Sequence, residues 1–232
     1  MPNRLIPYVK VLVHLLCLVP FLLLLERYRT GVLAAEADPV NLITHLTGNW
    51  ALWMLLISLA VTPVRRLHPK LGNLIRFRKM LGLYAFFYAT LHLGTYVFLF
   101  SGYDLPSAIA GLKAGHPGEI WRQWQSVWPT VADDLLKRRF IQVGLFSWVV
   151  LLALALTSPA RVLRAMGGKN WQRLHRMVYL AAIAGCVHFW WLVKVGVRAP
   201  LPDTLVLTGL LMARVVWVVM KRRRSPAARI AA

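Results

Sequence analysis

Among the histidines within or at the edge of strongly apolar stretches, where ionisable side chains are unusual, four are candidates for chemistry: His14, His92, His175 and His188. An ionisable group inside a membrane span is costly and usually functional. A neutral imidazole is also a common axial ligand of b-type haem iron. The alternative is that such a histidine only hydrogen-bonds one helix to another. The choice between these two interpretations depends on how the surrounding segments place the four side chains.

The composition is that of a membrane protein. Of the 232 residues, 58% are hydrophobic and the mean hydropathy is +0.57, whereas soluble domains contain about 45–50% apolar residues. We expect an all-α membrane protein in which residues 1–232 form a single domain of six transmembrane helices. The expected spans are at about residues 9–25, 45–62, 80–100, 140–157, 174–193 and 203–220.

Basic residues are distributed unevenly between these spans. The N-terminus, residues 63–79, residues 158–173 and the segment after residue 220 contain 17 of the 28 lysines and arginines and no acidic residue. The other three connecting segments contain nine basic and all eight acidic residues. The positive-inside rule therefore predicts that both termini are cytoplasmic. Because topology explains the net charge of +20, no nucleic-acid partner is expected.

Two of the histidines have the same predicted depth. His92 lies thirteen residues after Lys79, and His188 lies twelve residues after Arg176. At 1.5 Å per residue both imidazoles are about 18–20 Å from the cytoplasmic end of their spans. The two spans also run in the same direction. This is the placement that a bis-imidazole haem needs, so His92 and His188 are the predicted axial pair.

The other two candidates are nearer the cytoplasmic side. His175 is at the edge of its span, and His14, about 6 Å deep, is its preferred partner for a second haem, with His68 as the second choice. On an ideal helix His175 and His188 differ in direction by about 140°. Either the helix is irregular between them, which Gly185 would permit, or the two side chains serve different neighbours.

Several segments resemble the MsrQ (YedZ) family of the ferric reductase-like transmembrane superfamily: HLTGNWAL, RKMLGLYAFFYATLHL, ALTSP, WQRLHRMVYLAAI and HFWWLVK. The resemblance covers nearly the whole chain. It implies a b-haem protein of the bacterial inner membrane that also binds FMN. The implied role is to take electrons from the quinol pool or a cytoplasmic flavin reductase and pass them to MsrP, a periplasmic molybdopterin subunit that repairs oxidised methionine. The family's ligand histidines correspond to His92, His175 and His188.

The chain also departs from the wider superfamily. Relatives with two haems carry two ligand histidines on each of two helices, but here the third span has only His92, so either one or two haems remain possible. The sequence has no GxGxxG motif, so electrons must come from another protein or a lipid-soluble donor. We therefore expect an electron-transfer subunit and not the catalytic reductase itself.

The cytoplasmic arginines Arg76, Arg78, Arg173 and Arg176 can hold an FMN phosphate, although topology alone also explains them. Trp121, Trp124 and Trp128 have helical spacing, which predicts either a helix on the membrane surface or a docking surface for the periplasmic subunit. Two other functions remain open. One is a stand-alone ferric reductase-like cytochrome, and the other is a non-redox membrane transporter or assembly protein.

Overall fold

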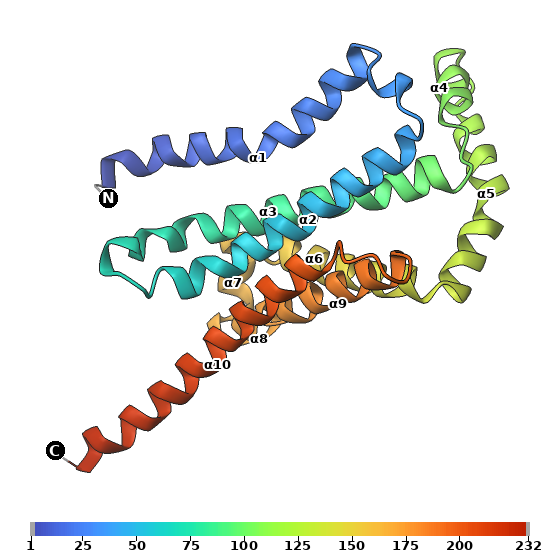
Figure 1. Cartoon of the computed structure of the whole chain (residues 1–232). Helices are drawn as coiled ribbons and strands as arrows, with labels where there is room; N and C mark the ends of the chain where they lie inside the picture. Colours follow the sequence, from blue (N-terminus) through green and yellow to red (C-terminus); the bar gives the residue numbers. More distant parts are fainter. Residues whose placement is uncertain (1–2, 231–232) are drawn as a thin grey trace.

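The computed structural model describes the backbone of residues 3–230 and side chains from Arg4 to Lys221. In this part of the chain every regular element is helical (Figure 1). The α-helices are α1 (Ile6–Arg29), α2 (Pro39–Val64), α3 (Ile75–Thr95), α4 (Leu105–Lys113), α5 (Gly118–Lys137), α6 (Arg139–Leu156), α7 (Ala160–Met166), α8 (Gly168–His175), α9 (Val178–Leu192) and α10 (Leu201–Ile230). A π-helical turn, η4 (Tyr96–Phe100), extends α3. The all-α prediction is confirmed.

Five helical segments are long and apolar enough to cross a membrane: Ile6–Arg29, Pro39–Val64, Pro69–Phe100, Arg139–Leu156 and Leu201–Lys221. They correspond to five of the six expected spans, and they make the chain a multi-pass membrane protein. The fifth expected span differs from its prediction. Its helix, α9, has 15 residues and is about 22 Å long, shorter than the roughly 30 Å hydrocarbon core of a bilayer.

The shortening has a local cause. The helix expected over residues 174–193 is interrupted at Arg176 and Met177, where the Met177 N–H donates to the Leu174 carbonyl in a tighter turn. The irregularity is therefore not at Gly185, which lies within regular α9. A side chain at Gly185 would touch Leu52 and Ser147, so this glycine allows α9 to approach its neighbours closely and does not bend the helix.

The helices pack as two pairs, α2 with α3 and α6 with α9, and these pairs pack against each other. Ala85, Ala181 and Ala182 are completely buried, because small residues allow membrane helices to come close together. Outside this four-helix core, α1 lies along α3, and α10 lies against α2 and α9. The outer faces of α1 and α10 expose many aliphatic side chains, as expected for surfaces that face lipid.

A buried tyrosine hydroxyl binds the backbone of α1 close to its internal proline, Pro20. The hydroxyl of fully buried Tyr88 donates to the Cys17 carbonyl, 2.6 Å away, one turn before Pro20. The carbonyl that Pro20 itself frees is that of Leu16, four residues before it, so the tyrosine bond supports the adjacent carbonyl in the same turn. The same bond fixes α1 to α3.

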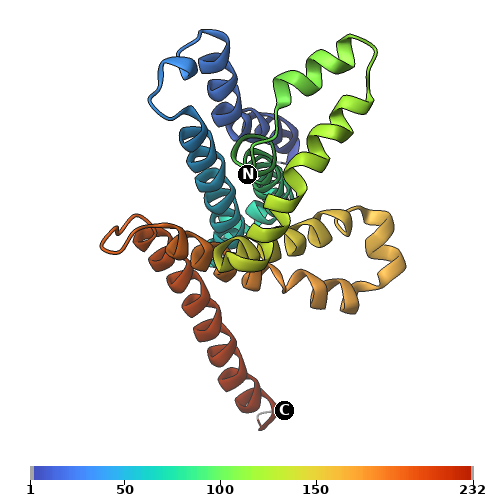
Figure 2. The same cartoon turned by 90° about the vertical axis from the view of Figure 1, so that its right-hand side faces the viewer.

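The two ends of the helix bundle carry different connections and termini. Figure 1 shows the start of α1, the α2–α3 connection and the end of α10 on one side of the molecule. The α1–α2 connection and the α4–α5 hairpin lie on the other side. Figure 2 shows that the α4–α5 hairpin projects away from the four-helix core.

Candidate functional site

His92 is held in one orientation by the α2–α3 pair. Its Nδ1 lies 3.0 Å from the Thr44 carbonyl oxygen on α2. The Thr44 hydroxyl donates to the Thr95 hydroxyl at 3.1 Å, and Thr95 donates to the His92 carbonyl at 2.7 Å. Both the ring and the backbone of His92 are therefore fixed by neighbouring groups.

His188 has the matching arrangement in the α6–α9 pair. Its Nδ1 lies 2.7 Å from the Phe140 carbonyl oxygen on α6. A carbonyl oxygen can only accept a hydrogen bond, so in each histidine Nδ1 carries the proton and Nε2 keeps a free lone pair. A ligating imidazole needs this tautomer, and metal-binding histidines usually make such a bond with the other ring nitrogen.

A glycine faces each imidazole from the adjacent helix. A Cβ at Gly48 on α2 would lie 3.0 Å from His92 Cε1, and a Cβ at Gly144 on α6 would lie 2.7 Å from His188 Nδ1. Neither position has space for a side chain unless the ring moves. Each helix pair thus supplies one histidine, one carbonyl acceptor and one glycine.

The two imidazoles face each other across the gap between the pairs. Their ring centres are 5.9 Å apart, with an angle of 80° between the ring planes. Bonds of about 2 Å from one metal ion to two imidazole nitrogens place the ring centres roughly 6 Å apart. The pair therefore fits a single metal ion between the rings.

The rest of the donor set limits what kind of metal centre fits. Among the residues that the structure describes, no group of three or more His, Cys, Asp or Glu side chains could hold a metal ion. Two imidazoles alone would leave the other coordination positions to a non-protein ligand. This matches a b-type haem, whose macrocycle supplies four nitrogens.

His175 lies in a different environment, at the other end of α6. Its ring stacks on Trp171, with centres 3.8 Å apart, and its Nε2 is 3.2 Å from the Thr157 hydroxyl. Trp171 also donates to the Thr157 carbonyl. The half-buried Arg78 is close enough to act electrostatically on His175. His175 and His188 therefore have different neighbours, and the helix is also interrupted between them at Arg176 and Met177, so both alternatives from helix geometry apply.

The predicted partners of His175 make other contacts. His14 is exposed on α1, with its Nδ1 2.9 Å from the Tyr84 hydroxyl. His68 caps a short 3₁₀ helix by accepting a bond from the Lys70 N–H at 3.1 Å. Within the described part of the chain, neither ring contacts His175. The pairing of His14 with His175 remains a prediction.

The proposed FMN arginines differ in burial. Arg78 is half-buried on α3, whereas Arg173 and Arg176 are exposed at the end of α8, as is Arg76 on α3. Arg78, from α3, acts electrostatically on His175, whereas Arg173 and Arg176 flank His175 in the chain.

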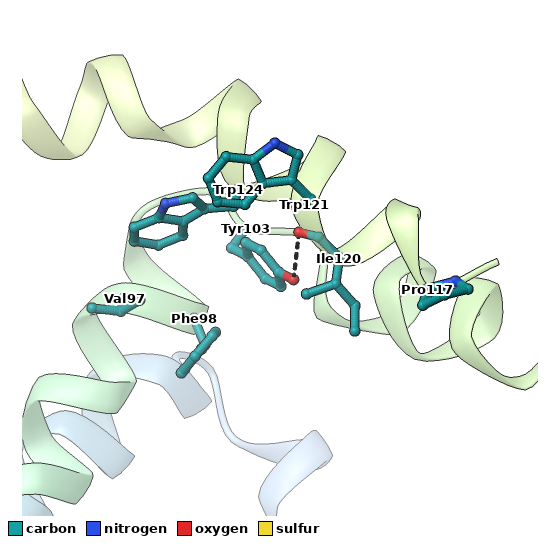
Figure 3. A pocket seen from close by; sticks show the side chains of 7 residues that line it. All are labelled: Val97, Phe98, Tyr103, Pro117, Ile120, Trp121 and Trp124. Carbon is teal, nitrogen blue, oxygen red and sulfur yellow. Dashed lines mark hydrogen bonds between the residues drawn. The ribbon is translucent and has the colours of Figure 1, made fainter.

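The three tryptophans of the long connection lie on α5, and two of them, Trp121 and Trp124, line an apolar pocket (Figure 3). Its volume is about 390 Å³, and it is lined by Val97, Phe98, Tyr103, Pro117, Ile120, Trp121 and Trp124. The Tyr103 hydroxyl is already used, since it donates to the Ile120 carbonyl at 3.3 Å. Trp121 and Trp128 remain largely exposed.

The cap of α4 lies next to this pocket. The Ser107 hydroxyl and backbone N–H both donate to Asp104 and hold the pKa of its carboxyl below the ordinary value. The α4 cap is therefore complete at neutral pH and is lost only as the pH falls through this lowered pKa.

Sequence reasoning missed chiefly the residues that hydrogen-bond to the rings of His92 and His188 or leave space for them. Thr44 and Phe140 act through their carbonyl oxygens, which every residue type possesses, so no sequence signal identifies them. Gly48 and Gly144 gave a weak signal as glycines inside apolar spans. Only their closeness to the rings shows what they do.

Comparison with known proteins agrees with this geometry. The family model "Ferric reductase like transmembrane component" matches residues 47–186, a segment that contains His92 and ends two residues before His188. A protein from Xanthomonas axonopodis pv. citri (strain 306) is 40% identical over 224 residues, covering 95% of this chain and 91% of the relative. A protein from Herminiimonas arsenicoxydans is 37% identical over 194 residues, covering 82% and 78%. Both bear the name "Protein-methionine-sulfoxide reductase heme-binding subunit MsrQ". From these matches along most of its length, the chain belongs to the MsrQ family of ferric reductase-like transmembrane proteins.

Proposed function

We propose that the chain is a b-type haem subunit that transfers electrons across the bacterial inner membrane, with His92 and His188 as the axial ligands. The observation that carries this proposal is the pair of imidazoles facing each other at 5.9 Å, each with Nδ1 bonded to a carbonyl. The name "heme-binding subunit" carried by the relatives supports it independently.

Each part of the site has a role in holding the haem. A bound low-spin haem would supply one-electron transfer. The Thr44 and Phe140 carbonyls keep Nε2 of each histidine unprotonated and directed for ligation. Gly48 and Gly144 leave space for the rings, and the packed helix pairs exclude water.

The proposed topology has six spans and cytoplasmic termini within a single domain of residues 1–232. The arrangement of the ends in Figure 1 supports an even number of crossings, and the distribution of basic residues supports the orientation. In this topology α9 is the fifth crossing and α10 the sixth, and the amphipathic α8 precedes α9 at the cytoplasmic surface.

Electron entry belongs to the cytoplasmic half in this proposal. The donor is the quinol pool or a cytoplasmic flavin reductase. FMN is bound near Arg78 and His175, with Arg173 and Arg176 nearby in sequence on the same membrane side. A second haem between His14 and His175 is the alternative use of this region, so that the chain carries one haem or two.

Electron exit is on the opposite side, to MsrP, a periplasmic molybdopterin methionine sulfoxide reductase. Reduction of one sulfoxide to methionine and water consumes two electrons and two protons, so the chain delivers two electrons per repair. The chain itself is the electron-transfer subunit and not the catalytic reductase.

The test is to purify the protein from haem-replete cells and record a reduced-minus-oxidised spectrum with the haem content per chain. We expect the absorption of a low-spin b-type haem, and we expect His92→Ala and His188→Ala to lose the same haem. His116→Ala, at an exposed position in the connection between α4 and α5, is the control. A colourless preparation would refute the proposal and favour a transporter or assembly protein, and loss of different haems in the two variants would refute the axial pairing.

The redox partner is tested separately. The reduced protein is mixed with purified MsrP and methionine sulfoxide, or with a ferric chelate. Reoxidation that requires MsrP supports the proposed system. Reoxidation by the chelate alone would identify a stand-alone ferric reductase-like cytochrome.

A further inference from the structure

A buried carboxylate joins the parts of the structure that carry the two histidines. Asp134 on α5 accepts a bond from the Tyr96 hydroxyl at 2.8 Å through Oδ2. Its Oδ1 lies 2.7 Å from Arg138 Nε. The Asp134 side chain is only 14% exposed and both of its oxygens are engaged, whereas the Arg138 side chain is 56% exposed, so the pair lies at the edge of the packed region. Charge-assisted bonds of this length are stronger than neutral ones.

One end of this network reaches the helix of His92. Tyr96 is one turn beyond His92, and its backbone N–H donates to the His92 carbonyl. Tyr96 also begins the π-turn η4, where the regular helix ends. A hydroxyl fixed at this point therefore fixes the outer end of α3, directly beside His92.

The other end reaches the support of His188. Arg138 is the single residue between α5 and α6, two positions before Phe140, whose carbonyl accepts the bond from His188. The Arg138 carbonyl accepts the Ile141 N–H at 3.0 Å, and the Gln142 side chain donates to the last carbonyls of α5. The α5–α6 corner is thus a rigid unit that positions the Phe140 carbonyl.

We propose that Asp134 is a positioning residue that sets the gap between His92 and His188 by joining the outer end of α3 to the α5–α6 corner. This inference rests on the proposed function, in which the two imidazoles ligate one haem iron. The His92 pair and the His188 pair pack against each other along α3 and α6, where Trp148 also donates to Thr90. The Asp134 link adds a charged connection at the outer end, beside the histidines, and there it controls how far apart the rings stand. No group of Asp134 touches the haem in this role.

The neighbouring Asp133 provides a matched control. It is the adjacent residue on the same helix and also forms an ion pair, with Lys137 at 2.6 Å. Its side chain is 53% exposed and links α5 only to itself. A change at Asp133 removes the same charge without affecting the link between the two pairs.

The experiment compares full-length Asp134→Ala, Asp133→Ala and Tyr96→Phe with the parent protein, all purified with haem. Haem retention is measured as the fraction of haem that stays bound after dilution. The axial ligation is read from the high-spin and low-spin signals in the electron paramagnetic resonance spectrum. We expect Asp134→Ala to retain haem about tenfold more weakly, the lower end of the effect of losing an outer-shell partner. We also expect a high-spin fraction, because one imidazole no longer reaches the iron. Tyr96→Phe, which removes one oxygen atom, shifts both readings in the same direction.

Asp134→Asn refines the test, since the amide still accepts from Tyr96 but loses the charge pair with Arg138. Its readings should lie between those of the parent and Asp134→Ala. The inference is overturned if Asp134→Ala and Tyr96→Phe keep the parent spectrum and retention, or if Asp133→Ala changes them equally. It is also overturned if haem is lost only in step with unfolding, while the remaining loaded protein stays fully low-spin. A parent protein without haem refutes the proposed function instead, so the two failures are distinct.

Discussion

Adding one methyl group at Gly144 should weaken haem binding through His188. A Cβ at this position would lie 2.7 Å from Nδ1, 2.9 Å from Cε1 and 3.2 Å from Cγ of the ring. Comfortable contact needs about 3.5–4 Å, so the ring must move by roughly 1 Å. The ring cannot move freely, because its Nδ1 is bonded to the Phe140 carbonyl at 2.7 Å. Overpacking of this kind costs about 2 kcal/mol, which corresponds to a roughly 30-fold loss of haem affinity.

The assay is a titration of the haem-depleted protein with haemin, together with the haem content of the protein as purified. Gly185→Ala is the matched control, since it lies on the same helix as His188, and its added carbon would meet Leu52 at an ordinary 3.5 Å. We expect Gly185→Ala to bind haem like the parent. Parent-like affinity and spectrum in Gly144→Ala would refute the reasoning that this glycine makes space for a ligand ring.

Two further changes test the fold. Tyr88→Phe leaves the Cys17 carbonyl beside the proline kink without its partner, so the free energy of unfolding should fall by about 1–3 kcal/mol with haem content unchanged. Thermal unfolding in detergent measures this, Tyr28→Phe at an exposed site is the control, and an unchanged melting temperature would contradict the proposed support of α1. For topology, Leu67→Cys and Val195→Cys place thiols at exposed positions in connections on opposite sides, while both native cysteines are buried. In intact cells a membrane-impermeant maleimide should label the cysteine at 195 and not the one at 67; the reverse pattern would place the termini outside.

Sequence reasoning was most reliable where a feature follows from local composition or spacing. Five apolar runs became helices long enough to span a membrane because each is continuous and apolar. Equal depth on parallel helices predicted that His92 and His188 lie close together, and their ring centres are 5.9 Å apart, with 80° between the ring planes. Their role as axial ligands stays a prediction. Depth is set by residue count and therefore can be read from the chain.

Features that depend on contacts between distant segments could not be obtained in this way. The break at Arg176 and Met177 has no proline or glycine to mark it, and it shortens α9 below the expected span. The contact of His14 with Tyr84 depends on the side of α3 against which α1 packs, which periodicity does not specify. The Asp134 network brings together residues 38 positions apart in sequence, and nothing in their local spacing indicates it.

The division of the site between two helix pairs also determines when it can form during synthesis. Thr44, Gly48 and His92 belong to the first half of the chain, so their local arrangement can be complete while the second half is still being made. The corresponding residues of the second pair come about a hundred positions later: Gly144 after Gly48, and His188 after His92. A nascent chain that ends before α9 presents one oriented imidazole without its counterpart. For the proposed site, we therefore expect haem capture by both histidines to be a late event, which follows membrane insertion of the second pair.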